Sequence, residues 1–335
     1  MNQFQLSRAR DLSDAIHAGA LAHTAQQGAE VRFLAGGTTL LDLMKLDVEK
    51  PMRVVDISRL PLDKIEATKD GGVSIGATAR NADLANHPLI KDSYAVLSEA
   101  VLAGASAQLR NMATTAGNLL QRTRCVYFRD TASPCNKREP GSGCSAMQGF
   151  NRTQAILGTS DSCIASNPSD MNVALAALEA TIHFEGTRGK RAVPIDEFYL
   201  LPGDTPECET LLEAGDLITH VSVPAPMEGA RSLYLKLRDR ASYEFALASA
   251  GVIVAVKDGR ITHARVGLGG VATKPWRSRE AEKELMNASP DEATFKRAAD
   301  AALADAKPQT ENGFKIELAR RCILHALKQV TTHAS

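Results

Sequence analysis

The 335-residue sequence lacks the features that mark membrane-spanning, exported and nucleic-acid-binding chains. No apolar run approaches the ~18 residues that a membrane helix needs, and the opening MNQFQLSRAR contains no apolar signal region. Acidic and basic residues number 39 each, so the net charge gives no reason to expect nucleic acid or an anionic membrane as a partner. These absences predict a cytoplasmic protein, or one that is exported together with a signal-bearing partner.

Internal repeats and low-complexity tracts are also absent, and the length predicts two or three packed units, because single cores rarely grow beyond about 250–300 residues. The Pro-Ala-Pro-Met-Glu-Gly run at 224–229 is the best candidate linker. Hydrophobic periodicity before it predicts helices over 11–28, 38–45, 81–85, 94–103 and 171–179, and strands over 31–35, 53–57, 72–76, 181–185 and 217–223. Beyond it we expect strands over 232–238, 248–257 and 261–268 and helices over 290–305 and 313–330.

The cysteines are concentrated in a stretch rich in Gly, Pro and Arg. Paired C-x2–4-C zinc knuckles and the C-x2-C-x2-C run of two-cluster ferredoxins are both missing. The remaining alternatives are a lone iron–sulfur cluster with widely spaced ligands, a disulfide pair or an accidental concentration of thiols. Cys322 follows a helical pattern and is expected in the core, and Cys208 lies in a loop with no assigned role. The other four, spaced C-x9-C-x8-C-x18-C, are Cys125, Cys135, Cys144 and Cys163.

Two glycine-containing loops are candidate cofactor sites. In Ala35-Gly-Gly-Thr-Thr-Leu40, free N–H groups before a helix favour an anion such as pyrophosphate, and the hydroxyls of Thr38 and Thr39 could donate to it. The alternative is a tight turn with glycine at positive φ and threonine as N-cap. The second loop, residues 108–121 (QLRNMATTAGNLLQ), could line a groove for a flat heterocycle or phosphates, or only satisfy its own backbone.

A third glycine run, Gly267-Leu-Gly-Gly-Val-Ala272, fits the dinucleotide fingerprint G-x-G-x-x-G/A. That motif requires a following helix, which Thr273-Lys-Pro275-Trp interrupts, and no second parallel strand with a ribose-binding acid appears. The glycines therefore predict a close turn or bulge at the end of a sheet.

Three motifs together resemble the FAD-binding subunit of the molybdenum hydroxylases, the xanthine dehydrogenase and aldehyde oxidoreductase family. Leu34-Ala-Gly-Gly-Thr-Thr-Leu-Leu41 is similar to the family's first flavin loop. Residues 108–118 are similar to its second loop, with Ala116 in place of one glycine, and Ala165-Ser-Asn-Pro-Ser-Asp170 is similar to the segment that closes over the flavin. The resemblance covers essentially the whole chain.

The cysteine stretch is similar to the insert that holds a [4Fe-4S] cluster in the FAD subunit of bacterial periplasmic aldehyde oxidoreductases. The flavoprotein subunit of 4-hydroxybenzoyl-CoA reductase also has an inserted cluster, but residues 118–125 and 140–144 resemble the aldehyde enzyme more closely. The resemblance thus implies a [4Fe-4S] cluster held by the four clustered cysteines. Cations should stabilise its negative charge, and the insert supplies Arg122, Arg124, Arg129, Lys137, Arg138 and Arg152. Because only a short connection separates the second flavin loop from Cys125, we expect the flavin and the cluster to lie near each other.

The resemblance also implies an α+β fold. A two-part FAD-binding domain of the vanillyl-alcohol-oxidase/CO-dehydrogenase flavoprotein type is expected over 1–226, divided into 1–60 and 61–226, with the insert at 122–165. A CO-dehydrogenase-flavoprotein-like domain with a small antiparallel sheet and helices is expected over 230–335. The FAD-binding residues that it implies are Leu34, Ala35, Gly36, Gly37, Thr38, Thr39, Leu40, Thr114, Thr115, Gly117, Asn118, Gln121, Asp170 and Lys236.

The activity implied by the resemblance is electron transfer in a heterotrimer, without a catalytic residue for substrate oxidation in this chain. A molybdenum-cofactor large subunit would oxidise an aldehyde, and a [2Fe-2S] small subunit would pass electrons to this FAD, which couples single-electron and paired transfer to an external acceptor. Periplasmic co-export is implied as well. The alternatives are a metal-stapled scaffold subunit without flavin and a self-sufficient FAD oxidase; neither loop offers a His or Cys for the covalent flavin that such oxidases usually carry.

Overall fold

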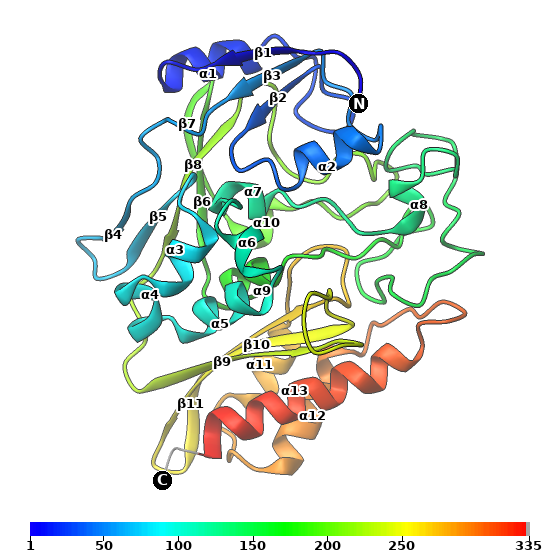
Figure 1. Cartoon of the computed structure of the whole chain (residues 1–335). Helices are drawn as coiled ribbons and strands as arrows, with labels where there is room; N and C mark the ends of the chain where they lie inside the picture. Colours follow the sequence, from blue (N-terminus) through cyan, green and yellow to red (C-terminus); the bar gives the residue numbers. More distant parts are fainter. Residues whose placement is uncertain (333–335) are drawn as a thin grey trace.

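The computed structural model describes residues 1–332, which form three sheets with helices packed between and against them (Figure 1). The first sheet has the order β1-β3-β2 and is parallel throughout. Parallel neighbours require crossover connections, and two helices supply them. The elements of this unit are β1 (Gln5–Arg8), α1 (Leu12–Gly19), β2 (Val31–Leu34), α2 (Leu40–Lys45) and β3 (Arg53–Asp56).

The second sheet is antiparallel, with the order β4-β5-β8-β6-β7. Buried and partly exposed residues alternate along β6, so one face lies on a core and the other does not. Helices pack on the buried face (Figure 1). The strands are β4 (Ile65–Ala67), β5 (Val73–Gly76), β6 (Thr181–Gly186), β7 (Gly189–Pro194) and β8 (Leu217–Val223), and the helices are α3 (Asn81–Asn86), α4 (Pro88–Ser93), α5 (Ala95–Ala103) and α9 (Asp170–Ala177), with α10 (Ile195–Phe198) following β7.

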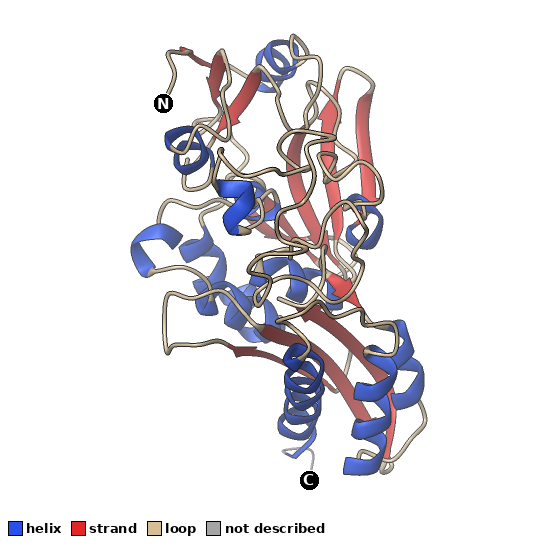
Figure 2. Cartoon of the chain, turned by 90° about the vertical axis from the view of Figure 1, so that its right-hand side faces the viewer, coloured by secondary structure: helices blue, strands red, loops and turns tan. Residues whose placement is uncertain are grey.

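The third sheet is also antiparallel, with the order β12-β11-β10-β9. Strand β10 is buried along most of its length because it is covered on both faces, by α9 and α5 on one side and by α13 on the other (Figure 2). The elements are β9 (Ala230–Leu237), β10 (Ala248–Lys257), β11 (Arg260–Gly269), β12 (Trp276–Arg277), α11 (Arg279–Leu285), α12 (Glu292–Ala302) and α13 (Phe314–Thr332).

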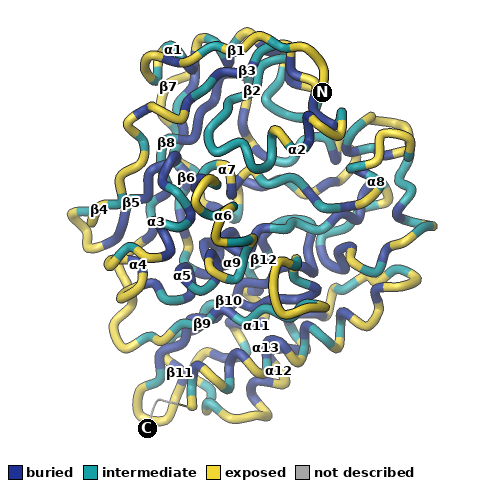
Figure 3. Tube along the Cα trace, viewed as in Figure 1, coloured by how far each residue is buried: buried dark blue, intermediate teal, exposed yellow. Residues whose placement is uncertain are grey.

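The cysteine-containing segment runs as loops along one side of the molecule and contains the short helix α8 (Val126–Arg129), and the second loop before it contains α6 (Ala107–Arg110) and α7 (Thr115–Leu119). Much of it is buried although it has little regular structure (Figure 3). Asn151, Gln154 and Lys315 are almost completely buried and hydrogen-bonded. The Lys315 ammonium donates to the Gln154 carbonyl at 2.8 Å and to the Gly270 carbonyl at 2.6 Å, which fastens the segment to the third sheet.

Four hydrophobic clusters stabilise these units. One lies beneath the first sheet, one within the second sheet and its helices, one in the third sheet, and one around the cysteines. We propose the domain limits 1–226 and 230–335 as the division of the chain; residues 333–335 of the second range lie outside the described residues. No helix within residues 1–332 is long and apolar enough to cross a bilayer.

The α+β fold is confirmed, but several predicted elements need correction. The helix predicted over 11–28 ends at Gly19, whose ideal Cβ would clash with the Phe33 ring, and the chain then turns back toward β2. Several elements were not predicted, and among them β1, β4, β7 and α11 carry few large apolar residues and were therefore not detectable by periodicity. The glycine run at 267–272 ends β11 with Gly270 at φ +70, as the turn interpretation predicted.

Candidate functional site

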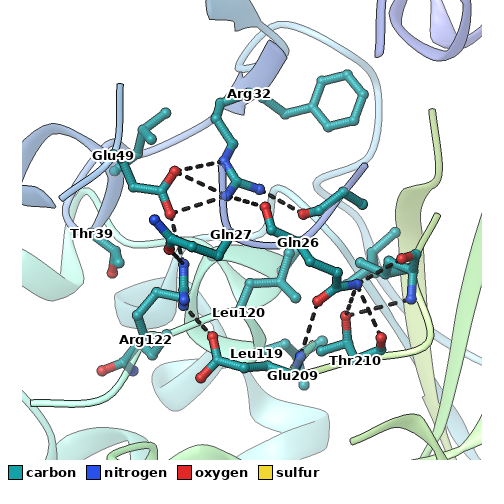
Figure 4. A pocket seen from close by; sticks show the side chains of 18 of the residues that line it. Gln26, Gln27, Arg32, Thr39, Glu49, Leu119, Leu120, Arg122, Glu209 and Thr210 are labelled. Carbon is teal, nitrogen blue, oxygen red and sulfur yellow. Dashed lines mark hydrogen bonds and ion pairs between the residues drawn. The ribbon is translucent and has the colours of Figure 1, made fainter. Parts of the chain in front are cut away.

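A cavity of about 240 Å³ separates the first sheet from the rest of the protein. One wall is the loop between β2 and α2, the second is the loop around α7, and the third is the chain over 208–218 that leads into β8. Much of the lining is apolar, including Leu43, Ile57 and Leu119. Figure 4 shows four of its charged side chains close together, those of Arg32, Glu49, Arg122 and Glu209. A mostly apolar cavity with a few polar groups is typical of a cofactor site.

The first glycine loop is the wall between β2 and α2, and all of its residues 34–40 line the cavity. Gly37 has φ +73, so the glycine part of the turn alternative is correct. Thr39 occupies the N-cap position of α2, as that alternative expects, but its side chain makes no capping hydrogen bond. An ideal Cβ on Gly36 would lie 1.9 Å from the Met112 carbonyl oxygen, so only glycine allows the two cofactor loops to meet here.

The second loop contributes Thr114, Gly117 and Gln121 to the cavity lining. Thr114 is the N-cap of α7, and its hydroxyl accepts a hydrogen bond from the Gly117 N–H at 3.3 Å. Thr115 and Asn118 are buried behind this wall. The Thr115 hydroxyl donates to the Ala79 carbonyl, and the Asn118 carbonyl oxygen accepts from the Ser169 hydroxyl at 2.7 Å. The loop is therefore held by the chain that follows β5 and by Ser169 at the start of α9.

Asp170 and Lys236 lie together but outside the cavity lining. The Lys236 ammonium donates to one Asp170 carboxylate oxygen at 2.8 Å, and the Tyr234 hydroxyl donates to the other at 2.5 Å. Burial, followed by the charge of Asp170, raises the pKa of Tyr234 well above its usual value, so Tyr234 remains a donor. The hydrogen bonds among Asp170, Tyr234 and Lys236 join the start of α9 to β9, beside the second loop.

Four charged side chains cluster in the cavity lining (Figure 4), and the sequence singled out only Arg122 among them. The Arg32 guanidinium pairs with Glu49, whose carboxylate also accepts from Arg122 at 2.7 Å. Arg122 in addition contacts Glu209 and donates to the Gln27 side chain at 2.9 Å. The cluster connects the first sheet, the cysteine segment and the chain before β8, and no local motif signals it because its members are far apart in sequence.

The four clustered cysteines surround a second, smaller cavity. Cys125, Cys135 and Cys163 are buried, Cys144 is partly exposed, and all six cysteines of the chain are free. The structure thus does not support the disulfide alternative. Cys322 is buried in the third core, as predicted.

Asn136 fastens three of the cysteine-bearing segments together. Its side-chain oxygen accepts from the Gly143 N–H at 2.7 Å, and its amide nitrogen donates to the Ser162 carbonyl at 3.1 Å. Gly143 has φ +102, a conformation that glycine adopts without strain. The Ala165 N–H points to the Cys163 sulfur at 3.5 Å. Backbone N–H groups directed at sulfur are common around iron–sulfur clusters.

The donor set consists of four thiols, which is a ligand set that both structural zinc and iron–sulfur clusters use. Burial raises the pKa of Cys163 to about 11 and raises those of Cys125 and Cys144. A metal would have to displace these protons, as it does at all thiolate sites. In the described part of the chain, however, no three or more His, Cys, Asp or Glu side chains form a group arranged to hold a metal ion. A cluster therefore stays a prediction.

The two cavities are neighbours. Lys137, Cys163 and Ala165 line both of them. In addition, the Arg129 guanidinium, at the end of α8, binds the Asp42 carboxylate of α2 through two hydrogen bonds of 2.9 and 3.1 Å. The structure therefore places the cysteine centre against the candidate flavin site, as the chain connectivity predicts.

Comparison with known proteins agrees with this architecture. The sequence pattern of the FAD binding domain in molybdopterin dehydrogenase matches residues 2–226, and that of the CO dehydrogenase flavoprotein C-terminal domain matches residues 233–330. The chain is 50% identical over 314 residues to the aldehyde oxidoreductase FAD-binding subunit PaoB of Escherichia coli (strain K12), which covers 93% of this chain and 95% of that protein.

Two further relatives are carbon monoxide dehydrogenases. The medium chain from Hydrogenophaga pseudoflava is 26% identical over 92% of each chain. A solved structure of the carbon monoxide dehydrogenase from the same organism, which lacks the Mo-pyranopterin moiety of the molybdenum cofactor, superimposes with a TM-score of 0.77 at 25% identity, covering 99% of this chain and 98% of that one. The chain therefore belongs to the FAD-binding subunits of the molybdenum hydroxylases, multisubunit oxidoreductases of the aldehyde oxidoreductase and carbon monoxide dehydrogenase type.

Proposed function

We propose that this chain is the flavin and iron–sulfur electron-transfer subunit of a molybdenum-dependent aldehyde oxidoreductase. It would receive electrons from a [2Fe-2S] small subunit, bind next to a molybdenum-cofactor large subunit that oxidises the aldehyde, and deliver electrons through FAD to an external acceptor. The observation that carries the proposal is the shared wall of the two cavities, because it sets a flavin pocket directly against four thiols. The 50% identity to an aldehyde oxidoreductase FAD-binding subunit supports the aldehyde class.

We assign the FAD diphosphate to the first loop, residues 34–40, where Gly36 and Gly37 bring the backbone close to the cavity. Thr114, Gly117 and Gln121 would contact the diphosphate and the ribityl chain, and Thr115 and Asn118 would support this wall from behind. Asp170 and Lys236, which lie outside the cavity lining, would hold the neighbouring chain in place beside the cofactor. FAD supplies the exchange between paired and single electrons, and the protein residues bind it, orient it and exclude water.

We assign the [4Fe-4S] cluster to the four cysteines that line the smaller cavity. Four thiols with no competing histidine or carboxylate among the cavity-lining residues suit iron and sulfide. The scaffold alternative, in which zinc replaces the cluster and flavin is absent, is disfavoured by the match to an FAD-binding domain over residues 2–226. A flavoprotein subunit of the 4-hydroxybenzoyl-CoA reductase type remains the second candidate, because it too would combine FAD with an inserted cluster. We also propose periplasmic co-export with a partner.

An absorption spectrum of the purified chain, with acid-released FAD and iron quantified, tests the proposal. We expect about one FAD and four irons per chain, as the proposed cofactors require. Cys135→Ser should lose iron and keep FAD, whereas Cys322→Ala should keep both, because Cys322 lies in the third core and lines neither cavity. Flavin without iron would refute the cluster and leave the flavin role intact. Zinc without flavin would refute the electron-transfer role altogether.

A further inference from the structure

Lys137 occupies an unusual place between the two cavities. It lies two residues after Cys135 and is only 7% exposed, and its side chain lines both the cysteine cavity and the flavin cavity. The ammonium donates to the Pro206 carbonyl at 2.8 Å and to the Glu209 carboxylate at 3.0 Å. A buried ammonium is costly to desolvate unless it is paired, and Glu209 and the Pro206 carbonyl are its partners here.

The charge around Lys137 does not cancel. Lys137 ends a continuous chain of ion pairs in which each carboxylate is shared by two cations. Burial opposes ionisation of Glu209, but the charges of Arg122 and Lys137 outweigh it and lower the pKa of that carboxyl. From the first sheet to the cysteines, the series of ion pairs consists of Arg32, Glu49, Arg122, Glu209 and Lys137. Three cations and two carboxylates leave one positive charge in excess.

The other basic residues of the insert are directed elsewhere. Arg124 and Arg129 bind Asp42, and Arg152 binds Asp239. Arg138 donates to the backbone carbonyls of residues 127, 128 and 133. Among the described residues of the insert, Lys137 is the one cation whose side chain lines the cysteine cavity.

We propose, resting on the [4Fe-4S] assignment above, that Lys137 is a positioning residue whose charge sets the reduction potential of the cluster and that Glu209 opposes it. A [4Fe-4S] cluster with four thiolates has a net charge of about −2, and its one-electron reduction makes this about −3. A fixed cation that lines the same two cavities as Cys163 stabilises the reduced form more than the oxidised form, and a low-dielectric surround strengthens the effect. The negative charge of the Glu209 carboxylate, 3.0 Å from the Lys137 ammonium, weakens this stabilisation.

The two side chains therefore have opposite predicted effects. Lys137→Gln removes the cation and should lower the midpoint potential, whereas Glu209→Gln frees Lys137 and Arg122 from their shared carboxylate and should raise it. We expect each variant to change the ratio of oxidised to reduced cluster about tenfold at the wild-type midpoint, or about 59 mV. Lys137→Arg keeps the charge and should stay close to wild type. Lys69→Gln, on an exposed turn, is the matched control.

The measurement is an EPR-monitored redox titration of the full-length chain, purified with any subunits that accompany it, with iron and FAD quantified in parallel. Opposite shifts in the two neutralised variants support the proposal. Unchanged midpoints in iron-replete variants overturn it, and shifts of the same sign overturn it too, because a loosened loop rather than a charge would cause them. If Lys137→Gln fails to retain iron, the other two variants test the proposal. A raised midpoint potential in Glu209→Gln, with a midpoint near wild type in Lys137→Arg, supports it, and an unchanged midpoint in Glu209→Gln overturns it. A wild-type chain without iron refutes the cluster itself, which distinguishes failure of the proposed function from failure of this inference.

Discussion

At the scale of single residues, contact between the two cofactor loops depends on one glycine. The Cβ that alanine would add at Gly36 meets the Met112 carbonyl oxygen at 1.9 Å and its carbon at 2.7 Å. Both atoms belong to the backbone, so no side-chain rotation relieves the clash. The first loop must move away from the second, and the cavity between them must open.

We predict that Gly36→Ala abolishes tight FAD binding and destabilises the fold by about 1–3 kcal/mol, the usual cost of overpacking. Gly313→Ala is the matched control, because the nearest atom to its ideal Cβ is the Pro308 Cβ at 3.9 Å. Acid-released FAD per chain and the midpoint of urea unfolding measure the two effects. Full flavin content in Gly36→Ala would contradict the role that we give to this contact.

At the scale of elements, the N-terminus of α9 is joined to the second cofactor loop. The Ser169 hydroxyl accepts the Asn172 N–H at 3.2 Å as N-cap of α9 and donates to the Asn118 side chain at 2.7 Å. Asn118 lies within α7, whose N-cap Thr114 lines the cavity. A helix cap thus fixes the position of a cofactor loop.

Ser169→Ala should cost about 1–2 kcal/mol of stability and weaken FAD binding about five- to tenfold, because Asn118 loses a partner. Ser278→Ala is the control: Ser278 is the buried N-cap of α11, accepts the Ala281 N–H at the same 3.2 Å, and does not itself line the cavity. It should lose similar stability and keep its FAD affinity. Flavin titration by fluorescence measures FAD affinity, and urea unfolding measures stability. Equal FAD affinity in the two variants would show that the hydrogen bond from Ser169 to Asn118 does not support FAD binding.

A second element-scale feature is a stacked histidine pair between β6 and β8. His183 and His220 are opposite each other in register, with ring centroids 4.0 Å apart. Burial lowers the pKa of both, and for His220 the charges of His183 and Lys190 add to this. Because the unfolded chain binds these protons more tightly, the pair's stability is present above pH ~6.5 and is lost as the pH falls through the lowered pKa values.

His220→Gln should therefore make the free energy of unfolding less sensitive to pH between 7.5 and 5.5. The exposed His325 of α13 provides the control, and His325→Gln should leave the wild-type slope in place. Urea unfolding at several pH values measures both slopes. An identical slope in His220→Gln and wild type would show that the stacked pair does not titrate in this range.

At the scale of the whole molecule, the sequence predicted the fold and the cofactor loops better than it predicted their surroundings. Glycine and threonine at fixed spacing made the first loop recognisable, and strands such as β10 and β11 followed from their apolar pattern. The charged cluster of Arg32, Glu49 and Glu209 was not predictable, because its members meet only through tertiary packing. The same holds for the adjacency of the two cavities through Lys137 and Cys163, although the short connection from residue 118 to Cys125 indicated it.

The most direct test of the account is a crystal or cryo-EM structure of the chain purified with its flavin. The account predicts density for FAD in the cavity between β2, α7 and the chain over 208–218, with its diphosphate against residues 34–40. It also predicts cluster density among Cys125, Cys135, Cys144 and Cys163. Flavin density elsewhere, with the first loop free of the diphosphate, would contradict the central claim.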